Sequence, residues 1–170
     1  VWLWQRPEGA ATAVSTFRIA ADFCEEFDGF VFNHNEALLY EWVEEFEPAL
    51  FARIQRLVRE GKWHIMGGWY LQPDCNMPAG ESFIRQIMAG RTYFEEKFGQ
   101  RPTTAISFDA FGHSRGLVQI MAKSGYDSYL VTRPSHRDLT LPAEDVVWVG
   151  YDGSEVMVRR CEEGYNSHPG

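Results

Sequence analysis

Residues 103–114 of the chain read TTAISFDAFGHS, an apolar run followed by a carboxylate and a turn. The run 103–108 predicts a short buried β-strand, and Asp109 comes directly at its carboxyl end. In folds built from alternating strands and helices, functional groups gather at that end of the strands. This segment therefore predicts both the fold class and the place of a site.

The same alternation extends outward from this strand in both directions. Further strands are predicted at 30–32, 62–66 and 127–132. Apolar residues at helical spacing predict helices at 11–27, 38–46, 48–60, 83–98 and 117–124, several of them stopped by a glycine. The segments 146–149 and 155–158 flank Tyr151-Asp152-Gly153-Ser154 and predict a β-hairpin. We expect an α/β fold around a parallel sheet, either open or closed into a barrel.

Composition narrows the class of protein. The 170 residues are 45% hydrophobic and 15% aromatic, which excludes a disordered chain and fits one globular domain or part of a larger one. The net charge of −8 argues against nucleic acid and anionic membranes as partners. No apolar run has the length of a membrane-spanning helix. Cys24, Cys75 and Cys161 are scattered and odd in number, so we expect neither a disulfide framework nor a zinc knuckle, and we predict a cytoplasmic location.

Polar and aromatic residues follow each of four predicted strands: 33–36, 69–74, Asp109 and Arg133. The loop 67–80 is long and rich in such residues, so it is a candidate site loop. Dinucleotide and P-loop glycine motifs are absent from the sequence, which removes the usual support for those binding functions.

Asp109 can act as a nucleophile or a metal ligand, or it can simply cap the following helix. Arg133 can bind an anionic group or stabilise Asp109, or it can be an exposed loop charge. His113 can hydrogen-bond to Asp109 and orient it, although a capping or packing role explains the presence of this histidine equally well. The aromatic residues with the shape to stack on a sugar, or else to pack in the core, are Trp2, Trp4, Trp69 and Tyr70.

Several short motifs together resemble one family. In chain order they are Trp2-Leu3-Trp4, Tyr40-Glu41-Trp42, Gly67-Gly68-Trp69, Gln72-Pro73-Asp74-Cys75-Asn76, Gly80-Glu81-Ser82, Asp109-Ala110-Phe111-Gly112-His113-Ser114, Ser124-Gly125 and Asp152-Gly153-Ser154. In this order they resemble the amino-terminal catalytic domain of the α-mannosidases of glycoside hydrolase family 38. The match runs over nearly the whole chain.

The resemblance implies a retaining α-mannosidase that cleaves terminal α-linked mannose through a covalent glycosyl–enzyme intermediate, with a Zn²⁺ ion holding the sugar hydroxyls. It implies an incomplete seven-stranded (β/α) barrel of the glycoside hydrolase/deacetylase type. Asp109 matches the residue that is both nucleophile and zinc ligand. Arg133 matches an arginine that contacts this carboxylate and keeps it ionised, and Trp2 matches the aromatic residue beneath the mannose. The implied partner is a mannose-containing glycan.

The family also has residues with no counterpart in this chain. Its His-x-Asp zinc pair lies upstream of the position of Trp2, and a second zinc histidine and the general acid lie downstream of Gly170. We therefore expect residues 1–170 to be part of a single catalytic barrel domain, truncated at both ends and inactive alone. Linkage preference stays open, and no role is assigned to 165–168. Two alternatives remain: a non-catalytic carbohydrate-binding barrel, and a metal-dependent polysaccharide deacetylase.

Overall fold

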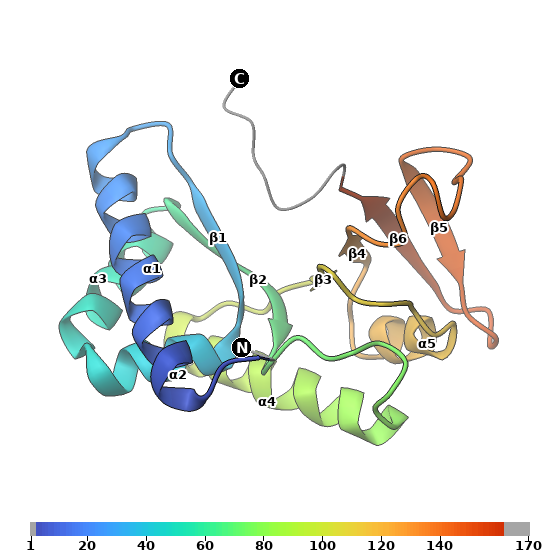
Figure 1. The fold of residues 1–170 in the computed structure, drawn as a ribbon, viewed down its shortest axis with the longest axis horizontal. Coiled ribbons are helices and arrows are strands. Elements are labelled where there is room, and N and C mark those ends of the chain that lie inside the picture. The colour runs from blue at the N-terminus through green and yellow to red at the C-terminus, as the bar shows by residue number, and fades with distance from the viewer. Residues whose placement is uncertain (1–2, 162–170) are drawn as a thin grey trace.

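The computed structural model describes residues 3–161, and its helices and strands alternate along most of the chain (Figure 1). In chain order the elements are α1 (Arg6–Glu26), β1 (Phe32–Glu36), α2 (Ala37–Phe46), α3 (Pro48–Arg59), β2 (Trp63–Trp69), α4 (Gly80–Phe98), β3 (Thr104–Ser107), α5 (Gly116–Lys123), β4 (Ser128–Val131), β5 (Asp145–Val149) and β6 (Glu155–Arg160). The predicted helices and strands are all present, and most of their ends differ from the prediction by a few residues. The α/β class is confirmed.

The strands of the described residues form two sheets. β1 pairs with β2 in parallel, and the second sheet has the order β3-β4-β6-β5. β3, β4 and β6 run parallel, whereas β5 is antiparallel to β6, with Val147 opposite Met157. The predicted hairpin is therefore confirmed, and it makes the second sheet mixed. A seven-stranded barrel remains a prediction.

Side chains connect the two sheets where no backbone ladder joins β2 to β3 among the described strands. The indole Nε1 of Trp69 donates to the carbonyl oxygen of Ile106 at 2.7 Å. The hydroxyl of Tyr126 donates to the carbonyl oxygen of Gly67, also at 2.7 Å. These buried donors satisfy main-chain acceptors that a neighbouring strand would otherwise pair.

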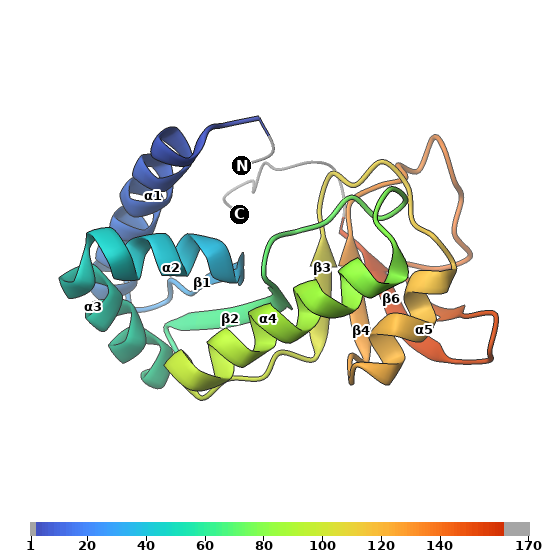
Figure 2. The same ribbon diagram turned by 90° about the horizontal axis from the view of Figure 1, so that it is seen from below.

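Two apolar clusters make up the core, and α4 contributes to both. Phe17, Tyr40 and Trp63 lie in the first cluster, which α4 completes with Phe94. The second contains Trp69 and Tyr129 together with other side chains of β3 to β6, and α4 adds Phe83 and Ile87 at its other end. α4 runs beneath β2 and β3 in Figure 1 and lies in front of them in Figure 2, which is seen from below, so this one helix supports both sheets.

Local sequence signals explain several helix ends. α1 begins with a capping box between Gln5 and Glu8 and has a proline in its first turn. α4 ends at Gly99, whose φ of 65° lies in the left-handed region that glycine adopts at little cost. None of the helices in the described part of the chain is long and apolar enough to cross a membrane.

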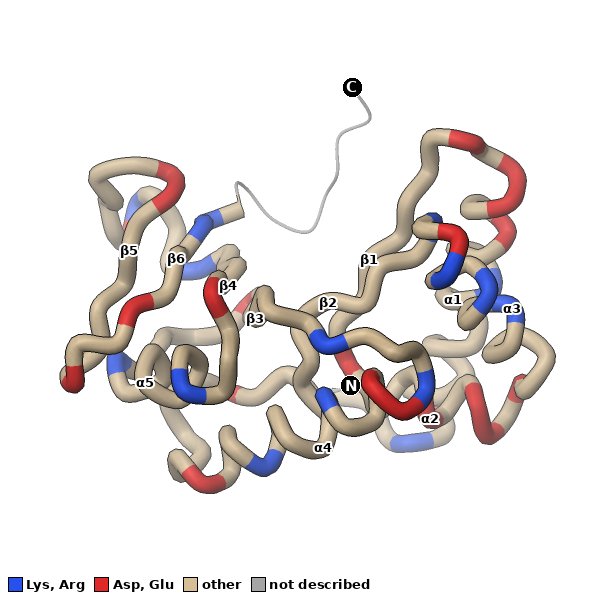
Figure 3. Tube along the Cα trace, turned by 180° about the vertical axis from the view of Figure 1, so that it is seen from behind, with Lys and Arg blue, Asp and Glu red and all other residues tan. Residues whose placement is uncertain are grey.

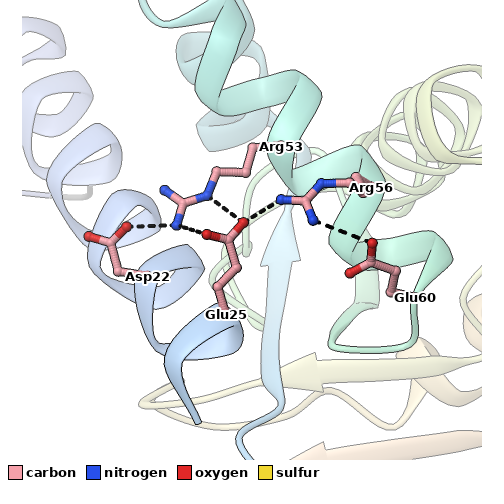
Figure 4. Close-up of polar contacts among 5 residues, drawn as sticks. All are labelled: Asp22, Glu25, Arg53, Arg56 and Glu60. Carbon is pink, nitrogen blue, oxygen red and sulfur yellow. Dashed lines mark hydrogen bonds and ion pairs between the residues drawn. The ribbon is translucent and has the colours of Figure 1, made fainter. Parts of the chain in front are cut away.

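Charged residues lie mainly on the helices and the hairpin, whereas β2 has none (Figure 3). The densest group joins α1 to α3 (Figure 4). In it, Arg53 donates to Asp22 at 2.7 Å and to Glu25 at 2.5 Å, and Arg56 bridges Glu25 and Glu60. Both arginines lower the pKa of Glu25, with the hydrogen bond from Arg53 as the largest cause.

Two strand ends differ from the prediction. The polar residues 33–36, expected to follow a strand, form most of β1 itself. The glycines Gly67 and Gly68, expected in the site loop, continue β2 as far as Trp69. Their φ values of 71° and 75° accompany a shift in the β1–β2 register between His34 and Glu36. A Cβ on Gly67 would lie 2.6 Å from the Cβ of Asn35, so the two strands approach closely only because the residue is glycine.

Candidate active site

Asp109 lies just beyond the carboxyl end of β3 with a strained main chain. Its φ of 62° is positive, and no other non-glycine residue among 3–161 shares this feature. Such conformations cost free energy and concentrate at functional sites. The backbone N–H of Asp109 donates to the hydroxyl of Thr132 at 2.9 Å, which helps to hold the conformation. The alternative that Asp109 caps the next helix is wrong, because α5 begins at Gly116 with Arg115 as its N-cap.

Arg133 faces Asp109 from the end of the adjacent strand β4. Its Nε donates to Oδ1 of Asp109 at 2.6 Å, and the two side chains are 51% and 43% exposed. The guanidinium also lies over the ring of Phe111, 5.3 Å from its centroid. The structure thus brings together the two predicted site residues that it describes. Their partial exposure leaves the pair accessible to a ligand.

His113 supports Arg133 through its main chain. Nε2 of the imidazole donates to the carbonyl oxygen of Arg133 at 2.9 Å, so Nδ1 accepts from the hydroxyl of Tyr129, also at 2.9 Å; this tautomer is assigned from the partners. Burial lowers the pKa of His113, which agrees with a neutral ring. The hydrogen bonds of His113 therefore connect its ring to Asp109 by way of Arg133.

Gln72 and Thr132 are polar contacts of this site that sequence reasoning did not single out. The side-chain amide of Gln72 makes two hydrogen bonds to the main chain of Phe108, the residue before Asp109. The backbone N–H of Gln72 donates to Oε1 of Glu36 at 3.0 Å, and burial raises the pKa of this carboxyl group. Gln72 lies within the predicted site loop 67–80, whereas Thr132 was predicted as the last residue of the strand 127–132, and neither residue was given a role of its own.

The aromatic candidates have different positions. Trp69 is fully buried and stacks on Tyr126, so packing explains it and the sugar-stacking hypothesis is wrong for this residue. The hydroxyl of Tyr70 donates to Glu41 at 2.9 Å. Trp4 is 54% exposed, at a small cavity that His34 and Glu36 also line. Trp2 lies outside the described residues, as does the segment 165–168.

A cavity of about 680 Å³ opens beside Arg133, between the chain after β4 and the β5–β6 hairpin. Most of its lining is apolar, including Phe111, Leu139 and Trp148, while Arg133, Arg160 and Asp138 add charges of both signs. Its volume lies in the range of small-molecule sites. Asp109 is not part of the lining, so the cavity adjoins the Asp109–Arg133 pair from the Arg133 side.

The described residues do not by themselves build a zinc site. Within 3–161, no group of three or more His, Cys, Asp and Glu side chains lies close enough together to hold a metal ion. A zinc site needs at least three protein ligands. Asp109 offers one oxygen ligand on a well-supported strand end, which is compatible with a metal site completed by other residues.

Comparisons with known proteins agree on one family. The sequence model of the protein family 'glycosyl hydrolases family 38 N-terminal domain' matches residues 1–169. The chain is 32% identical over 157 residues to alpha-mannosidase G of Dictyostelium discoideum, covering 92% of this chain and 14% of that protein. It is also 32% identical over 158 residues to alpha-mannosidase 2C1 of Mus musculus, covering 92% and 15%. The chain thus spans about one seventh of these relatives.

Solved structures show the same fold. An alpha-mannosidase from Enterococcus faecalis V583 superposes with a TM-score of 0.82 at 18% identity, covering 92% of this chain and 18% of that chain. A 4-alpha-glucanotransferase from Thermococcus litoralis gives 0.71 at 19% identity, covering 88% and 26%. A putative polysaccharide deacetylase from Mycobacterium smegmatis gives 0.59 at 11% identity, covering 92% and 47%, which shows a shared fold only. Because the family model matches residues 1–169 of 170, the chain belongs to glycosyl hydrolases family 38, as its N-terminal domain.

Proposed function

We propose that the protein containing this chain is a retaining α-mannosidase that removes terminal α-linked mannose from glycans. One observation carries the proposal: Asp109 stands at a strand end in a strained conformation and is ion-paired with Arg133 at 2.6 Å. Family membership and relatives named alpha-mannosidases support the substrate class.

The proposed chemistry begins with an attack by a carboxylate oxygen of Asp109 on the anomeric carbon of the mannose. The bond from that carbon to the glycosidic oxygen breaks, and the leaving oxygen takes a proton from a general acid outside the described residues. Water then hydrolyses the glycosyl ester, so the product keeps its anomeric configuration. In this mechanism Arg133 favours the ionised form of Asp109, and its hydrogen bond orients the carboxylate through Oδ1.

We further propose that Trp2 stacks beneath the sugar ring. Asp109 would be one ligand of a Zn²⁺ ion. The metal would hold the sugar hydroxyls, and its remaining ligands would come from outside residues 3–161. The proposal also includes a seven-stranded barrel, of which this chain forms a part. A cytoplasmic location belongs to the proposal because Cys24, Cys75 and Cys161 are all free thiols.

The test compares the full-length protein with its Asp109→Asn variant on an aryl α-mannoside. We expect kcat to fall by at least about 10³-fold, because a neutral amide cannot form the glycosyl ester. Proton NMR of the first product should show retention of configuration. Asp127→Asn is the matched control, because Asp127 lies at the opposite end of β4 and accepts a hydrogen bond from Ser128 at 2.7 Å.

Three results would contradict the proposal. Near-normal turnover by Asp109→Asn would remove the nucleophile assignment. Glycan binding without turnover by the wild-type protein would indicate a carbohydrate-binding barrel. Release of acetate without mannose would indicate a deacetylase.

A further inference from the structure

Gln72 occupies the boundary between the two sheets at their carboxyl ends. Its Nε2 donates to the carbonyl oxygen of Phe108 at 2.6 Å, and its Oε1 accepts from the N–H of the same residue at 2.9 Å. One side-chain amide thus satisfies both main-chain groups of Phe108. The amide therefore links the segment after β2 to the segment after β3, where no backbone ladder joins these two described strands.

The main chain of Gln72 is itself held in place. Its N–H donates to Oε1 of Glu36 at 3.0 Å, which ties it to the carboxyl end of β1. The N–H of the preceding Leu71 donates to Oε1 of Gln86 in α4 at 2.8 Å. Because β1 and α4 both anchor this segment, the amide of Gln72 is presented to Phe108 from a fixed support.

Phe108 is the residue through which this support reaches the nucleophile candidate. The N–H of Asp109 is held by Thr132 on the β4 side, and the preceding peptide is held by Gln72 on the β2 side. A residue with a φ of 62° keeps that conformation only where its surroundings determine it. The contacts from Gln72 and Thr132 restrain the two peptide units that precede the Cα of Asp109.

We propose that Gln72 is a positioning residue of the glycosidase reaction, which sets the attack geometry of Asp109 by clamping the main chain of Phe108. The inference rests on the proposed function, since it concerns the same reaction. A displacement of about 1 Å at a reacting group can cost 10²-fold in rate, so a clamp one residue away has a measurable effect.

The first test is the kinetics of Gln72→Met in the full-length protein. Methionine fills a similar volume but supplies neither hydrogen bond. We expect kcat on an aryl α-mannoside to fall by roughly 10- to 100-fold, with KM changed by less than about twofold, because the clamp acts on the attacking group and not on sugar binding. The thermal midpoint is measured for each variant.

Gln55→Met is the matched control. Nε2 of Gln55 donates to the carbonyl oxygen of Lys97 at 2.7 Å, so this variant also loses a glutamine–main-chain bond, between α3 and α4 and away from Asp109. We expect a similar fall in the thermal midpoint and an unchanged kcat. This pair separates a positioning role from a general loss of stability.

Gln72→Glu separates hydrogen bonding from packing. The carboxylate has nearly the shape of the amide and still accepts from the N–H of Phe108, but it cannot donate and places an oxygen against the Phe108 carbonyl. We expect kcat to fall at least as far as in Gln72→Met. A role in packing alone predicts the wild-type rate for this variant.

The outcomes separate the two proposals. Failure of the proposed function appears in the wild-type protein, as absence of mannosidase activity, and it overturns this inference with it. Failure of the inference alone appears in an active wild-type protein whose two Gln72 variants keep kcat within twofold, or whose Gln55→Met control loses kcat equally.

Discussion

Among single residues, Asp109 and Arg133 form the pair on which the candidate site depends, because a carboxylate on a strained main chain meets a guanidinium from the next strand. The main chain of Asp109 has a φ of 62°, and Arg133 donates to one of its carboxylate oxygens at 2.6 Å. His113 fixes the main chain of Arg133 in turn. Residues from two neighbouring strand ends thus form a hydrogen-bonded chain from His113 through Arg133 to the carboxylate of Asp109.

His34 shows how burial couples to pH elsewhere in the chain. Its ring lies among aromatic side chains, 4.8 Å from the centroid of Phe17 and 5.8 Å from that of Tyr40. Burial lowers the pKa of His34 from 6.5 to about 4. The unfolded chain therefore takes up this proton at a higher pH than the folded protein, and stability present at pH 7 is lost as pH falls through this window.

The variant His34→Phe tests this coupling in the full-length protein. We expect the wild-type free energy of unfolding to fall by about 1–2 kcal/mol more than that of the variant between pH 7 and pH 5, with the lower figure reflecting partial exposure of the ring. Urea unfolding followed by tryptophan fluorescence measures the difference. Equal pH dependence in the two proteins would show that His34 is protonated equally in both states.

At the element scale, α4 lies against β2 so closely that a single methyl group matters. A Cβ on Gly90 would lie 2.3 Å from the carbonyl oxygen of Gly68 and 2.4 Å from the carbonyl carbon of Trp69. Main-chain atoms cannot move aside as a flexible side chain can. α4 and β2 would have to separate, and the separation would disturb the support of both clusters of the core.

We therefore expect Gly90→Ala to destabilise the protein by about 1–3 kcal/mol. Gly29→Ala is its control, because no atom lies within 4 Å of a Cβ placed there. The control should be neutral or slightly stabilising, since alanine restricts the unfolded chain. Urea midpoints of the full-length variants measure both effects, and equal midpoints would contradict the close packing of α4 on β2.

The ion network between α1 and α3 gives a second prediction at this scale. The side chain of Arg53 is 25% exposed and bonds Asp22 and Glu25, whereas Arg85 is 76% exposed and pairs with Glu81 inside α4. We expect Arg53→Met to lower the free energy of unfolding by about 1 kcal/mol and Arg85→Met to leave it nearly unchanged, because networks of ion pairs stabilise more than isolated surface pairs do. The Arg53 effect should shrink in 1 M salt. A salt-independent loss would point to packing of the Arg53 stem instead.

The sequence predicted the elements well and their connections less well. Apolar spacing and glycine stops indicate helices directly, as at Gly99, because those signals act within a few residues. Gly67-Gly68 resembles a turn by composition, yet it continues β2, because the close approach of Asn35 decides the conformation there. Contacts between distant segments carry no local pattern that sequence reasoning can use.

The candidate site follows the same division. Asp109 and Arg133 were predicted because each follows an apolar run, and motif order added their roles. Gln72 and Thr132 were missed as site residues, because their importance depends on which main-chain groups they meet across the sheet boundary. No backbone ladder joins β2 to β3 in the described chain, and this gap depends on tertiary structure. The sequence therefore does not show that the Gln72 side chain contacts the main chain of Phe108 there.

At the scale of the whole molecule, the described residues form two sheets and two apolar clusters that α4 spans, with Asp109 near the boundary between the sheets. Exposed apolar side chains remain on the hairpin, among them Val147, Tyr151 and Met157 at 60%, 78% and 55% exposure. The chain covers only 14–15% of its curated relatives. The activity therefore has to be measured on the full-length protein.

In the proposed reaction Asp109 forms a covalent bond to the sugar. A fluorinated α-mannosyl fluoride that slows the second step should trap this intermediate in the full-length protein. We predict a mass increase of one fluoromannosyl group per protein, located by peptide mapping on the peptide containing Asp109 and absent from Asp109→Asn. An active enzyme that is labelled at another residue would contradict the account.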